Sequence, residues 1–195
     1  MQHYPLSLSF KIIAIAPQIT VTDASGRLVM YVKQKAFKLK EQVRVFGDRE
    51  QSAQLYTIAA DRIIDWSARY DINRTDGTHV GAVKRRGARS LWRATYDFMR
   101  GGSVVMTLEE GNAWVKIADG LLGEVPVLGA FTGFLFNPTY TVSDASGRTL
   151  LRIVKRRSLF ESKFNITAEG SLTGEDEELA VLGIMMMTLL ERSRG

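Results

Sequence analysis

The chain has 195 residues, of which 45% are hydrophobic and 24% are charged, and its formal net charge is +5. This composition fits one globular domain with a sizeable core and shows no low-complexity bias. The absence of cysteine excludes disulfides, zinc–thiolate sites and a cysteine nucleophile, while the mild positive charge favours anionic partners without identifying one.

The N-terminal segment carries Lys11 within its apolar part and lacks a cationic leader, so we expect no cleaved signal peptide. Near the other end, the apolar stretch from Leu179 to Leu190 would span about 18 Å as a helix, which is too short for a hydrocarbon core of about 30 Å. We therefore expect a cytoplasmic protein whose contact with a membrane, if it has one, is peripheral.

A short motif occurs three times along the chain. The sequence Ile19 to Arg27 returns almost unchanged as Tyr140 to Arg148, and a looser copy begins at Tyr70. The glycine seven residues into each copy is Gly26, Gly77 or Gly147. Aspartate followed by glycine at this spacing predicts hairpin turns rather than phosphate-binding loops, so we interpret these residues as architecture.

Most of the remaining chain alternates apolar and polar residues with a period of two, as Phe37 and Leu39 do with Lys38 and Lys40. The strands predicted beyond this point, in chain order, are Leu55–Ala59, Arg62–Trp66, Ala68–Ile72, His79–Lys84, Leu91–Phe98, Val104–Leu108, Thr149–Lys155 and Leu159–Thr167. Short strands spaced by about 8 to 12 residues are typical of a sandwich or a barrel. The glycine-rich segment from Gly111 to Tyr140 breaks the alternation, and we interpret it as a connection between two repeated halves.

The C-terminal segment has the pattern of a helix without a solvent face. Glu175 to Glu178 suit the first turn of a helix, and Thr188 is the only polar side chain between Leu179 and Leu190. A helix that is apolar on every side must be surrounded by other elements. In a chain of strands, we expect those surroundings to be the interior of a closed sheet.

The aspartate–glycine repeats, the run from Tyr31 to Val45 and the terminal apolar helix together resemble the LURP-one-related proteins, which belong with tubby C-terminal domains and phospholipid scramblases. The resemblance covers nearly the whole chain. It implies a mainly β fold, a closed antiparallel barrel of about twelve strands around a buried C-terminal helix. We expect a single domain over residues 1–195, with repeated halves at approximately 1–110 and 111–174 and the central helix at 175–192.

No constellation in the sequence indicates catalysis. His3 and His79 lack a second metal ligand at helical spacing, and we interpret Asp61 with Asp65, like the Glu109–Glu110 pair, as solvated strand ends. Motifs for nucleotide binding and for a nucleophilic serine are missing, as is an acidic loop of the scramblase calcium type. We expect no enzymatic activity, no cofactor and no metal.

Two basic runs are the candidate binding residues: Lys84, Arg85, Arg86 and Arg89, and Lys155, Arg156 and Arg157. Tubby domains bind phosphoinositides through basic residues on the barrel, so the resemblance implies that these runs bind phosphoinositide or other anionic phospholipid headgroups. Interleaved aromatic residues such as Trp92 and Tyr96 leave a nucleic-acid-associated regulatory protein as the alternative. A lipid carrier or scramblase-like protein is the second alternative.

Overall fold

The structure, a computed structural model, describes residues 2–11, 18–33, 42–61, 68–86, 94–111, 139–156 and 161–192. The strands of this part of the chain are β1 (Leu6–Lys11), β2 (Gln18–Thr22), β3 (Leu28–Lys33), β4 (Val43–Phe46), β5 (Gln54–Ala60), β6 (Arg69–Arg74), β7 (His79–Arg85), β8 (Thr95–Arg100), β9 (Ser103–Glu110), β10 (Thr139–Asp144), β11 (Thr149–Arg156) and β12 (Glu161–Ala168). The helix is α2 (Gly174–Arg192).

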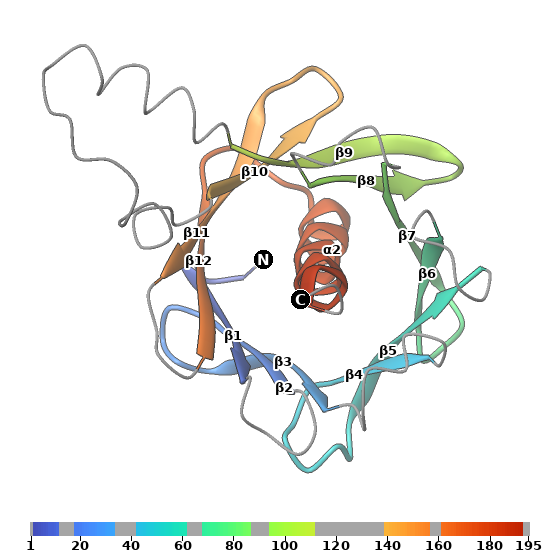
Figure 1. Cartoon of the computed structure of the whole chain (residues 1–195). Helices are drawn as coiled ribbons and strands as arrows, with labels where there is room; N and C mark the ends of the chain where they lie inside the picture. Colours follow the sequence, from blue (N-terminus) through green and yellow to red (C-terminus); the bar gives the residue numbers. More distant parts are fainter. Residues whose placement is uncertain are drawn as a thin grey trace, which may run out of the picture.

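The strands form one closed antiparallel barrel in which each strand pairs with its neighbours in the chain, and β1 closes the ring against β12 (Figure 1). Inward residues alternate with outward ones, as on β1, where Leu6, Leu8 and Phe10 are buried. The closed barrel predicted from the sequence is confirmed. The predicted strand Arg62–Trp66 and residues 91–93 of another lie outside the described residues, as does 112–138 of the glycine-rich segment.

Helix α2 lies inside the ring of strands (Figure 1). Every residue from Leu179 to Leu190 is buried, so the helix has no solvent face along this length. At Gly183 the helix lies tightly against the wall, because an added Cβ would lie 2.5 Å from the ring of Phe98 on β8. The predicted central helix, 175–192, is therefore confirmed, and the observed helix begins one residue earlier.

The three copies of the motif form three equivalent hairpin turns. Asp23, between β2 and β3, accepts hydrogen bonds from the backbone and hydroxyl of Ser25 and from the backbone of Arg27. Asp144, between β10 and β11, accepts the same three bonds from its own neighbours. The third copy connects β6 to β7, so the motif recurs every four strands. The division into two halves at residue 110 stays a prediction.

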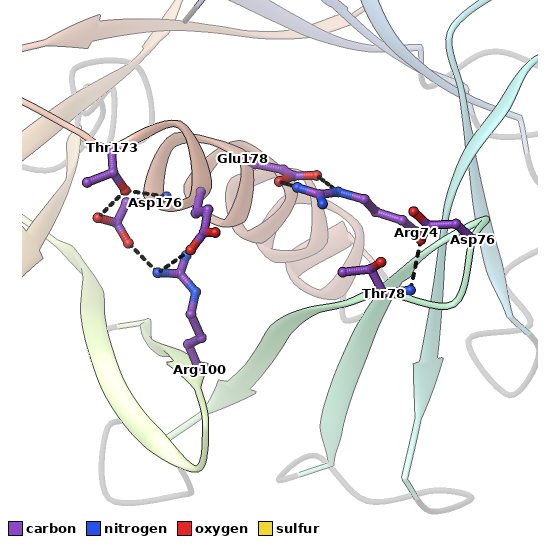
Figure 2. A network of polar contacts seen from close by, with 8 residues as sticks. Arg74, Asp76, Thr78, Arg100, Thr173, Asp176 and Glu178 are labelled. Carbon is purple, nitrogen blue, oxygen red and sulfur yellow. Dashed lines mark hydrogen bonds and ion pairs between the residues drawn. The ribbon is translucent and has the colours of Figure 1, made fainter.

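Because neighbouring strands run in opposite directions, the three turns lie at the same end of the barrel, where α2 begins. We call this the helix-start end, and the opposite end, where α2 finishes, the helix-finish end. At the helix-start end, Thr173 caps α2 by accepting a hydrogen bond from the backbone N–H of Asp176. Two ion pairs join the wall to the first turn of the helix, Arg100 with Asp176 and Arg74 with Glu178 (Figure 2).

Candidate functional site

The basic run on β7 is split between the two faces of the barrel wall. Lys84 is exposed on the outside, in register between Arg69 on β6 and Asp97 on β8. Arg86, just beyond the strand, is also exposed and forms an ion pair of 2.8 Å with Asp97. The hydrogen bond from this guanidinium to Asp97 raises the pKa of Arg86 above its usual value. Within the described residues, Lys84 has no ion pair.

Arg85, another candidate binding residue of this run, lies on the inner face of the wall. Only 8% of Arg85 is exposed, because β7 continues its alternation past the buried Val83. Its Nε atom lies 3.5 Å from a carboxylate oxygen of Glu191 on α2, and its guanidinium lies 6.0 Å from the centre of the Tyr96 ring. Arg85 is therefore a contact between wall and helix and is not available to a surface ligand.

The run on β11 shows the same division. Arg156 is exposed on the outside, directly opposite Lys163 on β12, whereas Lys155 is half-buried and faces the interior. Strand β11 is four strands away from β7 in the barrel order. The outward members of the two runs therefore form separate surfaces. Arg89 and Arg157, the remaining candidates, lie outside the described residues.

The inward Lys155 lines a pocket of about 140 Å³ at the helix-finish end. The lining residues from the wall are Phe10, Tyr140, Lys155, Ser162 and Phe164, and those from α2 are Met187, Thr188 and Glu191. The aromatic side chains and Met187 form apolar walls, while an ammonium, a carboxylate and hydroxyl groups supply polar contacts. The pocket can therefore receive a small ligand that is partly apolar and partly charged.

Glu191 connects this pocket to Arg85. Its carboxylate accepts a hydrogen bond of 2.5 Å from the hydroxyl of Tyr96, beside the contact with Arg85. Burial, together with Glu191, raises the pKa of the Tyr96 hydroxyl far above its usual value of 10.0. Burial also raises the pKa of Tyr140, helped by the charges of Glu110 and Glu191. Both hydroxyls therefore stay protonated at neutral pH, and that of Tyr96 donates its hydrogen to Glu191.

The two ends of the barrel differ in charge within the described residues. The basic residues near the helix-finish end are Lys11, Lys33, Arg44, Arg69, Lys84, Arg85, Arg86, Lys155, Arg156 and Lys163. The acidic residues there are Asp61, Asp71, Asp97, Glu109, Glu110, Glu161 and Glu191. At the helix-start end the acidic residues of the turns and of the first helical turn outnumber the arginines. The excess positive charge is thus concentrated at the helix-finish end.

His79 and Asp61, which were also considered from the sequence, have structural partners. The ring of His79 lies 3.2 Å from Asp71, and Asp61 accepts the backbone N–H of Arg69. Asp65 lies outside the described residues. In the part of the chain that the structure covers, no group of three or more ligand residues is placed to hold a metal ion. Nor does that part contain a helix both long enough and apolar enough to span a bilayer.

The sequence matches no family model and no curated protein. Among solved structures, the chain is similar to the X-ray structure of a protein from Arabidopsis thaliana, AT5G01750, with 13% identity and a TM-score of 0.51. The match covers 100% of this chain and 94% of the plant protein. At this identity the likeness concerns the fold, and it leaves the function of the pocket and of the basic end to be argued from their own residues.

Proposed function

We propose that this protein is a non-enzymatic binding module that attaches to anionic lipid headgroups at a membrane surface. The observation that carries the proposal is the concentration of cations at the helix-finish end. Lys33, Lys84 and Arg156 are exposed there on different sides of the barrel, and no ion pair joins any of them to another described residue. Cations distributed around one end favour attachment by that end over attachment by the side of the barrel.

The resemblance of the sequence to LURP-one-related proteins, and through them to tubby domains, supports a lipid headgroup as the anionic partner. A phosphoinositide, which carries several phosphates, offers the highest density of charge for such a surface. The location that follows is cytoplasmic and peripheral, on the leaflet that carries anionic lipids.

Each lysine or arginine close to an anionic surface contributes about 1 kcal/mol, which corresponds to about fivefold in affinity. In sedimentation with vesicles of anionic lipid in a background of neutral lipid without choline, we therefore expect Lys84→Gln and Arg156→Gln each to weaken binding about fivefold. Raised salt should weaken the wild type in the same way.

Arg49→Gln is the matched control, because Arg49 is exposed and lies in the turn between β4 and β5 at the helix-start end. It removes the same charge from the protein and should leave vesicle binding unchanged. The same variants should be tested against duplex and single-stranded DNA. Equal loss in all three variants, binding that ignores anionic lipid, or tighter binding to DNA than to the vesicles would contradict the proposal.

A further inference from the structure

The pocket at the helix-finish end contains opposite charges that do not neutralise each other directly. Lys155 and Glu191 both line it, yet within the described residues no ion pair joins Lys155 to any carboxylate. Arg85 and Tyr96 hold Glu191 from the wall of the barrel, and thereby position its carboxylate. A ligand that carries both a positive and a negative group would contact Glu191 and Lys155 together.

The apolar walls indicate which kind of positive group fits. The rings of Tyr140 and Phe164 lie 6.5 Å apart between centroids, are inclined at 60°, and line the pocket with Phe10. Aromatic rings beside a carboxylate are the surroundings that proteins use for methylated ammonium groups, which have no N–H to donate and are attracted to ring faces. A primary ammonium would instead need several hydrogen-bond acceptors.

The negative group of the ligand would be bound by Lys155, with Ser162 beside it. An ammonium and a hydroxyl are donors that suit phosphate, and the protonated hydroxyl of Tyr140 adds a third. The pocket has a volume of about 140 Å³. That room suits a headgroup and is too small for a whole lipid.

We propose that this pocket binds phosphocholine, with the trimethylammonium near Glu191 and the aromatic rings and the phosphate at Lys155 and Ser162. The same chemistry occurs in a phosphatidylcholine headgroup and in free phosphocholine. This inference does not rest on the proposed attachment to anionic lipid, since the ligand is measured without a membrane.

The test is calorimetric titration of the full chain with phosphocholine, choline and inorganic phosphate separately. The wild type should bind phosphocholine about tenfold or more tightly than either part, because only the whole ligand uses both charges. Lys155→Gln should weaken phosphocholine about tenfold and leave choline unchanged. Glu191→Gln should weaken choline and phosphocholine but strengthen inorganic phosphate, because the repelling carboxylate is gone.

Phe164→Leu keeps an apolar residue and should reduce the preference for phosphocholine over phosphoethanolamine. Arg49→Gln, which removes an exposed charge at the helix-start end, is the control and should change none of these affinities. If Glu191→Gln fails to fold, the phosphocholine affinities of Lys155→Gln and Phe164→Leu test the proposal instead. The proposal is overturned if millimolar phosphocholine gives no binding to the wild type, or if the binding is indifferent to Lys155→Gln.

Vesicles separate the two sources of the ligand. If the lipid headgroup is the ligand, the protein should bind pure phosphatidylcholine vesicles at high salt, and free phosphocholine should release it. If free phosphocholine binds to the pocket but does not compete with vesicles, the ligand is the soluble molecule. In both cases the pocket binds phosphocholine, and in both cases Lys155→Gln should weaken that binding.

Discussion

Replacing Gly183 with alanine tests the position of α2 inside the barrel. In a helix with open space at this position, the change would stabilise the protein by about 1 kcal/mol, because glycine is a poor helix former. Here the new methyl group would lie 2.5 Å from two ring atoms of Phe98, which is fully buried and cannot move aside. Overpacking of a core costs about 1 to 3 kcal/mol. We therefore expect Gly183→Ala to lower the free energy of unfolding by about 1 kcal/mol.

Urea denaturation measures this change, and two further variants identify its cause. Gly174→Ala, in the first turn of the same helix, meets nothing within 4 Å and should be neutral or slightly stabilising. Phe98→Leu removes the ring, so adding Gly183→Ala to it should cost much less than adding it to the wild type. A stabilising Gly183→Ala in the wild type would refute the contact between α2 and β8.

Two other predictions follow from buried or hydrogen-bonded charges. Arg85→Gln should lower the free energy of unfolding by about 1 to 3 kcal/mol because it removes a buried cation that contacts Glu191, whereas Lys84→Gln should stay within about 0.5 kcal/mol in the same denaturation assay. The hydrogen bond from the Ser25 hydroxyl, with the backbone bonds of the turn, lowers the pKa of Asp23 from 3.8 to about 2, and the equivalent bonds lower the pKa of Asp144. Because these pKa values are lower in the folded state, their stabilising contribution is complete above pH 3.8 and is lost as the pH falls towards 2. Urea midpoints measured across this range should fall with pH, and less steeply in Asp23→Asn; an identical slope in that variant would contradict the assignment.

The fold could be predicted because its signals are local and repeated. The motif around Gly26 and Gly147 predicts a hairpin turn, and both glycines have the positive φ of 83° that such a turn needs. The helix could be placed at the centre because a helix that is apolar on all sides must be surrounded by other elements. In a chain of strands, a closed barrel provides those surroundings. The pairing of β1 with β12 is different, since no sequence pattern records a contact across almost the whole chain.

The candidate site was harder to predict, although part of the signal was present. Alternation from Val83 to Arg85 and from Ile153 to Lys155 places Arg85 and Lys155 on the inner face of the wall. Treating each basic run as one solvated surface overlooks this alternation. The interior position of Glu191 could not be predicted from the sequence, because a charged residue after an apolar helical segment usually marks the solvated end of the helix. Its role depends on the length of α2, which brings it level with the pocket on the wall.

The closure of the barrel also sets conditions on how the chain folds. Strand β1 can pair with β12 only after β12 has been synthesised, and the apolar interior of the wall is covered only after α2, which follows β12 in the chain, has been synthesised. Contacts between elements so far apart in sequence are slow to form, because a long loop must close before they contribute any stability. We therefore expect the nascent chain to expose apolar strand faces until synthesis of α2 is complete, which makes it dependent on chaperones at a stage when β1 to β12 have already been made.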